Sequence, residues 1–354
     1  MNIVNLSPFL ENNPITASAP CRLDMGGTLD IRTFYWPLSW LKPCTVNIAL
    51  DMRTTVRLLP YEPGSIRVSS RGFDSAEMPI ESVPFTHPLG LIFAVAYYFR
   101  AGGLHVEIDS ASPPRSALGG SSVAAVALIT ALIRFFEQEQ AAAPLNMLQT
   151  ALLAHAIEES AAGVPCGMQD HLAAVYGGIN RWDWPENIQA PPFTRKQLVS
   201  NEATPDFSRR LLVAYCGVPH TSKDVNGVWI KQFLSGKARS QWIEIAKCST
   251  QFANSLENLN ITDAVTAMKR EMAIRKEMTP GVLDDLGDDL ISAASDGDCG
   301  ARITGAGAGG CIWALGEPDA IRNLRPVWEK ILSKREGARI LNCGVDPLGV
   351  TTHV

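Results

Sequence analysis

The sequence has 354 residues, of which 46% are hydrophobic and 19% are charged, and its formal net charge is −5. At roughly 100–200 residues per domain, this length predicts two domains. The small charged fraction argues against disorder, and the acidic balance argues against a nucleic-acid partner, because phosphate binding needs a clustered basic surface.

The apolar run 123–133 is shorter than the roughly 20 residues that span a bilayer, and the eight cysteines form no C-x-x-C pair. We therefore expect a cytoplasmic protein with reduced thiols and no membrane partner.

The first half of the chain mixes strands and helices. Apolar and polar side chains alternate over residues 104–109, which predicts a half-buried strand. A long apolar run over residues 121–136 predicts a buried helix. Two further helices are predicted over about residues 148–162, ending at Gly163, and from about Met168 to Gly177. Residues 182–205 contain four prolines and little periodicity, so they are our candidate domain junction.

The second half is mainly helical over residues 223–295 and then returns to strands. Short strands are predicted at 301–304 and 311–315, followed by a helix at 319–334 and a strand at 339–343. Strands and helices are interleaved without the regular repeat of a parallel sheet, which predicts an α+β fold. We expect one domain over residues 1–195 and a second over residues 206–354. The segment His220–Lys223 suits either a lid over a ligand or a helix cap.

The segment Pro114–Ser122 lies between a predicted strand and a predicted buried helix. Gly119 and Gly120 allow close backbone approach, and a helix N-terminus presents unpaired N–H groups, so this loop is a candidate phosphate site. Ser121 or Ser122 would either cap the helix or place a hydroxyl on Mg²⁺. No lysine follows the glycines, which excludes a Walker A loop.

The segment Gly305–Gly310 fits the pattern G-x-G-x-x-G by letter. A dinucleotide site requires a helix after the glycines, whereas a strand is predicted here. Four glycines in six positions therefore indicate either a tight turn or a backbone packed against a ligand or a second loop.

Charged residues near glycine-rich turns are the remaining candidates. Asp170 begins a helix after a Gly/Pro-rich loop, where it would orient or deprotonate a substrate hydroxyl, or simply complement the helix dipole. Glu158 lies late in the preceding helix, where its charge opposes the dipole, so a metal partner is worth considering. Arg22 and Asp30 bracket a glycine turn that suits either sugar hydroxyls or a surface ion pair.

Three of these motifs occur in the order of the three motifs of the GHMP kinases: Pro-x-Arg at residues 20–22, the Gly-Ser-Ser loop, and the Thr-Gly-Ala-Gly-Ala-Gly-Gly-Cys loop at 304–311. The sequence resembles that superfamily over nearly its whole length. Residues 165–170 and 302–311 resemble galactokinase segments, and residues 163–180 are also similar to bacterial heptose kinases and fucokinase-type enzymes. The resemblance implies a two-domain α+β fold, with an N-terminal domain like domain 2 of ribosomal protein S5 and a ferredoxin-like C-terminal domain.

The resemblance also implies an ATP- and Mg²⁺-dependent kinase. Its implied acceptor is a sugar, at the anomeric C1 hydroxyl of a hexose or heptose. The alternatives are a kinase for a non-sugar alcohol of the mevalonate or homoserine type, and a non-catalytic member that senses nucleotide or sugar. The oligomeric state stays open.

Carried over position by position, the resemblance makes Asp170 the carboxylate that faces the reacting hydroxyl, with Arg22 beside it. It makes Ser121 and Glu158 the Mg²⁺ ligands. The implied ATP-binding residues are Pro114, Ser116, Leu118, Gly119, Gly120, Ser121, Ser122, Gly305 and Gly307. The implied substrate-binding residues are Gly27, Asp30, Asp170, Gly307 and Gly309.

The sequence departs from the superfamily pattern in three features: the second motif, the interval from Arg22 to Asp30, and residue 29. Arg115 stands where a small residue is usual in the second motif, and this motif has less glycine before Leu118 than is typical. The interval from Arg22 to Asp30 is one residue shorter than in typical sugar kinases, and Leu29 stands where a threonine is expected.

Overall fold

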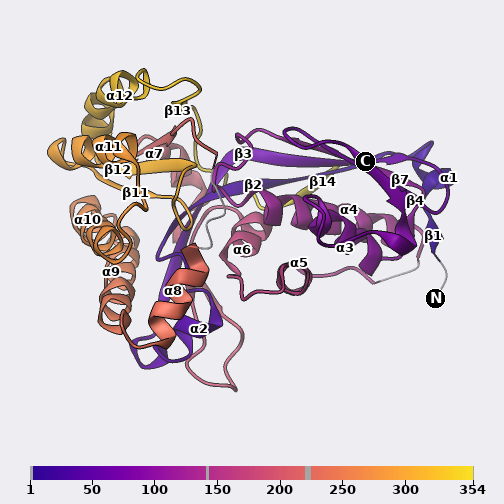
Figure 1. Cartoon of the computed structure of the whole chain (residues 1–354), viewed down its shortest axis with the longest axis horizontal. Helices are drawn as coiled ribbons and strands as arrows, with labels where there is room; N and C mark the ends of the chain where they lie inside the picture. The colour runs from indigo at the N-terminus through magenta and orange to yellow at the C-terminus, as the bar shows by residue number, and fades with distance from the viewer. Residues whose placement is uncertain (1–2, 141–142, 220–224, 354) are drawn as a thin grey trace.

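A computed structural model describes residues 3–140, 143–219 and 225–353. The segment His220–Lys223, predicted as a lid or a cap, lies outside these residues. The described chain forms two sheets, each with its own set of helices (Figure 1).

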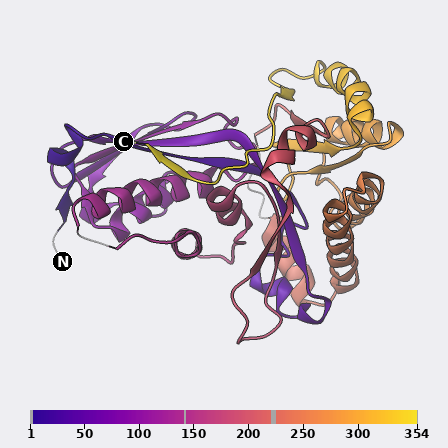
Figure 2. The same cartoon turned by 180° about the vertical axis from the view of Figure 1, so that it is seen from behind.

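The larger sheet is mainly antiparallel and is built around two long strands. Strand β2 (Ile15–Met25) pairs with β3 (Cys44–Pro60), and almost every side chain of β2 is buried. Its other strands are β14 (Thr351–His353) on the far side of β2, then β7 (Leu104–Ser110), β4 (Ser65–Ser70) and β5 (Ala76–Pro79) beyond β3, with β8 (Ile179–Asp183) and β9 (Thr194–Val199) joined to the start of β3. Figure 2 shows β14 returning from the C-terminal part of the chain to this sheet.

One face of the larger sheet is covered by helices (Figure 1). The central one, α4 (Gly120–Gln138), packs on β2 and β3, and its neighbours are α3 (Gly90–Tyr98), α5 (Met147–Ala162) and α6 (Gln169–Tyr176). Helix α4 is long and apolar enough to cross a membrane, but 72% of its apolar window is buried inside the protein. It is therefore a core helix, which is why its sequence is apolar on all sides.

Local signals fix the ends of α5. Asn146 forms a capping box with Gln149 at its start, and Gly163 ends it with a left-handed φ of 65°. The chain then turns through residues 163–168 into α6, so these caps position the loop that precedes Asp170.

The smaller sheet is antiparallel, with the strand order β11-β12-β10-β13. Its strands are β11 (Gly300–Ile303), β12 (Cys311–Leu315), β10 (Leu211–Tyr215) and β13 (Arg339–Leu341). The helices of this part are α8 (Val225–Leu234), α9 (Arg239–Glu257), α10 (Ile261–Met278), α11 (Asp285–Asp296) and α12 (Pro318–Leu332). The short helix α2 (Arg32–Tyr35), which follows β2, packs against α8. This contact brings the Arg22–Asp30 segment to the boundary between the two parts.

The remaining described elements are short. They are β1 (Val4–Asn5), α1 (Ser7–Leu10), β6 (Ala101–Gly102) and α7 (Thr204–Ser208), and three 3₁₀ turns at Ser39–Leu41, Ile80–Ser82 and Asn201–Ala203.

The structure confirms the α+β class and most of the predicted elements, including β7, α4, α5, α6, β11, β12 and α12. One interpretation was incomplete: residues 182–205, taken as an irregular junction, contain the end of β8 and all of β9. The side chains of β9 are mostly exposed, so it lacks the apolar alternation that reveals a strand. The division at residues 195 and 206 stays a prediction.

Candidate active site

A cavity of about 450 Å³ lies where β2, the N-terminal ends of α4 and α6, and the Gly305 loop meet. Residues predicted from four distant stretches line it: Arg22, Asp30, Pro114, Ser116, Gly119, Gly120, Ser121, Ser122, Glu158, Asp170 and Gly305. Four other predicted residues, Gly27, Leu118, Gly307 and Gly309, are not among the described residues that line it.

Three of these four lie in the layer beneath the cavity. Leu118 is fully buried, and its carbonyl accepts a hydrogen bond from the Arg22 backbone N–H at 3.2 Å. A Cβ atom on Gly27 would overlap the Asp24 carboxylate, and one on Gly307 would lie 2.7 Å from Ile303. All three positions are therefore closely packed, and the two glycines leave no room for a side chain.

Asp170 lies in the first turn of α6 and is held by Arg22. Arg22 Nε donates to Asp170 Oδ1 at 2.7 Å, and Arg22 Nη1 donates to the Ala117 carbonyl at 2.8 Å. Burial alone would lower the pKa of Arg22, but the carboxylates of Asp170 and Asp24 outweigh it and raise that pKa. Arg22 therefore stays cationic beside the carboxylate that faces the cavity.

Asp24 connects Arg22 to the second part of the molecule. Its carboxylate accepts from Arg302 Nη1 at 2.8 Å and from the Gly305 backbone N–H at 2.8 Å, and it lies 3.4 Å from Arg22 Nη1. Burial alone would raise the pKa of Asp24, but Arg302, Arg22 and the Gly305 N–H together lower it. Asp24 is therefore ionised, and it connects β2 to β11 and to the glycine loop.

The same network continues into α10. Arg302 also donates to Glu271 at 3.2 Å, and Glu271 pairs with Arg275 at 2.5 Å. These three side chains are at most 1% exposed. The whole network has three arginines and three carboxylates, so its formal charges cancel: Arg22, Arg302, Arg275, Asp170, Asp24 and Glu271. Buried charges of this kind are tolerated only when each one is paired.

Ser121 and Glu158, the predicted metal ligands, lie together at the start of α4. Glu158 accepts from Ser122 Oγ at 2.6 Å and from Ser121 Oγ at 3.4 Å, and it lies 2.6 Å from His171 Nε2. Burial alone would raise the pKa of Glu158, but His171 and Ser122 outweigh it and lower that pKa. An ionised carboxylate beside a hydroxyl is a donor set that suits Mg²⁺, so these residues fit the ion.

The start of α4 also fits an anion. Its N-cap is Gly119, with φ 83°, and no side chain caps the first turn. Ser121 and Ser122 both donate to Glu158 instead, so the interpretation of either serine as a helix cap is wrong. A Cβ atom on Gly119 would lie 3.1 Å from Asp170 Oδ2. The first-turn N–H groups therefore lie close to Asp170 and carry the positive end of the helix dipole.

The two loops on either side of the cavity contact each other through their backbones. A Cβ atom on Gly310 would lie 2.6 Å from the Ser116 carbonyl, and one on Gly305 would lie 3.5 Å from the Ala117 carbonyl. Arg115 and Ala117 take left-handed φ angles of 54° and 62°, which glycine adopts more easily. The second motif therefore keeps a glycine-like path despite having fewer glycines than typical relatives.

Asp30 also lines the cavity and is 4% exposed. Its Oδ2 accepts from the Gln169 backbone N–H at 3.0 Å, whereas Oδ1 has no hydrogen-bond partner among the described residues. Burial, together with the nearby Asp170 charge, raises the pKa of Asp30 to about 6. A Cβ atom on Gly167 would overlap this carboxylate, so the loop before α6 packs directly on it.

The raised pKa of Asp30 predicts a pH-dependent stability. The folded chain binds this proton up to about pH 6, and the unfolded chain releases it near 3.8, so stability falls as the pH rises between these values. At about 1.4 kcal/mol per pKa unit, the free energy of unfolding falls by about 3 kcal/mol over this range. Asparagine does not titrate, so the free energy of unfolding of Asp30→Asn relative to that of the unaltered chain should increase by about 3 kcal/mol as the pH rises from about 4 to about 7. Urea unfolding of both proteins across this range checks it, and a constant difference would contradict it.

Sequence reasoning missed several residues of the site. Asp24, Glu271 and Arg302 form the buried network, and Asn226 and Gln169 line the cavity. One signal was available: Asp24 lies two residues after Arg22 in a strand, which places both side chains on the same face. Apolar side chains from α3 and from the segments near β4 and β7 also line the cavity, namely Phe73, Leu89, Leu91, Ile92 and Ile108.

Comparisons with known proteins agree with this geometry. The family model for the GHMP kinases N terminal domain matches residues 90–178. The chain is 26% identical over 332 residues to a mevalonate kinase of Thermococcus sibiricus, covering 85% of this chain and 89% of that protein. It is 24% identical over 237 residues to a D-glycero-alpha-D-manno-heptose 7-phosphate kinase of Campylobacter jejuni, covering 66% of each. The galactokinase of Lactococcus lactis, solved with galactose, superposes with a TM-score of 0.72 at 14% identity, covering 98% of this chain and 99% of that chain.

These comparisons liken the chain to ATP-dependent kinases whose acceptor is an alcohol, and the family match covers residues 90–178. The GHMP kinase fold expected from the sequence is confirmed. At 14% identity the galactokinase match supports the fold alone.

Proposed function

We propose that this chain transfers the γ-phosphate of ATP to a hydroxyl group of a sugar bound between Asp30 and Asp170. One observation carries the proposal: the Arg22–Asp170 pair, the Ser121–Glu158 pair and the glycine loop all meet at one cavity. A phosphoryl transfer site needs these three parts, because its work is to position two substrates and to offset phosphate charge.

The acceptor end of the cavity favours a neutral molecule rich in hydroxyl groups. Asp30 Oδ1 is a buried acceptor with no hydrogen-bond partner in the described part of the chain, and a sugar hydroxyl would supply a hydrogen bond. Arg22 is already paired with Asp170 and Asp24, so it is not free to bind a carboxylate on the acceptor. A carboxylate there would also face Asp30 and Asp170, which is unfavourable.

A non-sugar alcohol of the mevalonate type is the second candidate. The mevalonate kinase of Thermococcus sibiricus aligns with 85% of this chain, whereas the Campylobacter heptose kinase aligns with 66%. The names of these relatives therefore support the non-sugar alternative better than the sugar acceptor, which rests on the chemistry of the cavity.

In the proposed mechanism, the N–H groups at the start of α4 bind the phosphate oxygens, and the Arg22 guanidinium holds the Asp170 carboxylate in place. Ser121 and Glu158 would hold Mg²⁺, which offsets phosphate charge when bound. Asp170, held by the hydrogen bond from Arg22 Nε, orients the reacting hydroxyl and accepts its proton. The apolar side chains Phe73, Leu89 and Ile92 form the wall for the nucleobase.

Coupled ADP release tests the proposal. The purified chain is given saturating ATP and Mg²⁺ with a panel of hexoses, heptoses and heptose phosphates, and with mevalonate and homoserine in parallel. We expect turnover with a sugar and none with the two non-sugar alcohols. Turnover with mevalonate or homoserine alone would overturn the sugar acceptor but not the kinase. No ADP release together with no binding of ATP in the presence of Mg²⁺ would overturn both.

Replacing Gly167 by alanine should weaken acceptor binding. The new Cβ would overlap the Asp30 carboxylate, and relieving such crowding costs about 1–3 kcal/mol. We expect a higher KM for the acceptor with little change in the KM for ATP, measured by initial rates with each substrate varied. Gly297→Ala, at the end of α11, is the control because its nearest new contact is a looser 3.3 Å. Equal changes in both KM values would contradict this prediction.

A further inference from the structure

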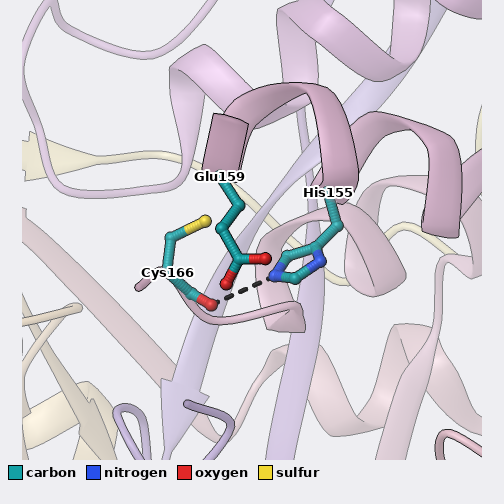
Figure 3. Close-up of side chains that lie close together, drawn as sticks. All are labelled: His155, Glu159 and Cys166. Atoms are coloured by element: carbon teal, nitrogen blue, oxygen red, sulfur yellow. Dashed lines mark hydrogen bonds between the residues drawn. The ribbon is translucent and has the colours of Figure 1, made fainter. Parts of the chain in front are cut away.

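Three potential metal ligands gather beside the cavity, and two of them lie on α5, the helix that also carries Glu158. His155 and Glu159 are four residues apart on α5, so they share one face of the helix. Cys166 follows in the loop that leads to α6. One donor atom of each residue lies within 4.8 Å of the others, and Figure 3 shows the thiol, the carboxylate and the imidazole ring converging.

Two of the three side chains have no partner among the described residues. Among the described residues, the Glu159 carboxylate and the Cys166 thiol have no hydrogen-bond or ion-pair partner, although both are only partly exposed. His155 is 5% exposed, and its Nε2 lies 3.0 Å from the Cys166 carbonyl oxygen. A carboxylate and a thiol held side by side repel each other once ionised, so the arrangement gains most from a bound positive ion.

The donor set selects the type of ion. Imidazole nitrogen, thiolate sulfur and carboxylate oxygen are together the ligands of Zn²⁺ and of similar thiophilic ions. Mg²⁺ prefers oxygen ligands only, so the Ser121–Glu158 pair and this cluster suit different ions. Three protein ligands leave one coordination position, which the Cys166 carbonyl or a water molecule can fill.

We infer that His155, Glu159 and Cys166 bind one thiophilic divalent cation such as Zn²⁺, and that this ion fixes the loop 163–168. On binding, the Cys166 thiol gives its proton to the solvent, and the His155–Cys166 hydrogen bond is exchanged for bonds to the ion. Gly167, which packs on Asp30, is the next residue in this loop. The ion therefore connects α5 to the loop that packs on Asp30 in the cavity. The site itself does not depend on the proposed kinase activity.

Titration of the full chain with Co²⁺ alone, as a spectroscopic substitute for Zn²⁺, tests the site. A thiolate ligand gives a sulfur-to-cobalt charge-transfer band in the near ultraviolet, which oxygen ligands such as Glu158 and Ser121 do not produce. We expect one equivalent of this band per chain and its loss on addition of Zn²⁺. Cys166→Ala should abolish the band, and His155→Gln should weaken Co²⁺ binding by at least about tenfold.

The matched control is Cys343→Ala, which removes another partly buried cysteine outside the cluster and should leave the band unchanged. Absence of the band in the unaltered chain, or its persistence in Cys166→Ala, would overturn the site. Zn²⁺ should also slow amide hydrogen exchange over residues 163–168. Unchanged exchange despite a normal band would overturn the fixing of the loop.

Discussion

Asp170→Asn should lower kcat by about 10²–10⁴-fold while leaving ATP binding intact. Asparagine has almost the same shape as aspartate and keeps an oxygen for the hydrogen bond from Arg22 Nε, so the packing at the start of α6 should persist. The amide carries no charge and cannot accept the hydroxyl proton, so the acceptor loses both its orientation and its base. Initial rates of ADP release and calorimetric titration with ATP measure the two effects separately.

The control for this substitution is Asp319→Asn, because the Asp319 side chain is 82% exposed on α12. Its kcat should equal that of the unaltered chain. Near-normal turnover of Asp170→Asn with intact ATP binding would remove Asp170 from the mechanism. Loss of ATP binding would instead show that Asp170 acts on the nucleotide.

Arg302→Met should destabilise the fold by about 3–5 kcal/mol. Arg302 is fully buried and pairs with Asp24 at 2.8 Å and with Glu271 at 3.2 Å. Methionine fills much of the same volume, so the main loss is electrostatic: Asp24 and Glu271 stay buried without their shared cation. Urea unfolding followed by circular dichroism measures this loss as a lower midpoint at an unchanged slope.

The matched control is Arg322→Met. Arg322 also pairs with an aspartate, Asp319, but the two side chains are 69% and 82% exposed. An exposed pair contributes about 0–1 kcal/mol, so this variant should unfold almost like the unaltered chain. Similar losses of stability in both variants would show that burial does not determine how much the Arg302 ion pairs stabilise the fold.

Much of the fold was predictable because its signals are local. The Asn146 capping box and Gly163 define α5 within a few residues, and the glycines after Tyr176 end α6. The apolar run of α4 indicated a buried helix because strands are usually only about 3–10 residues long. These signals lie in the same stretches as the cavity, which is why most predicted site residues are found around it.

The rest depended on contacts between residues far apart in sequence. Strand β2 alternates apolar and polar residues, but its polar face is buried as well, because residues far away in sequence pack on it and pair with Arg22 and Asp24. Arg302 and Asp24 are 278 residues apart, and nothing in the sequence near either one indicates an ion pair. The unpartnered Asp30 oxygen likewise results from the loop around Gly167, which packs on it only in the folded chain.

Strand β14 has a consequence for biosynthesis. Thr351–His353 complete the edge of the sheet that carries Arg22 and Asp24, and Arg53 from β3 binds Asp346 and the carbonyls of Leu348 and Gly349. A ribosome delivers residues in order, so β2 and β3 are made well before residues 346–353, and the edge of their sheet stays open until those residues follow. The sheet that carries Arg22 and Asp24 is therefore completed only after the second part of the chain has been made.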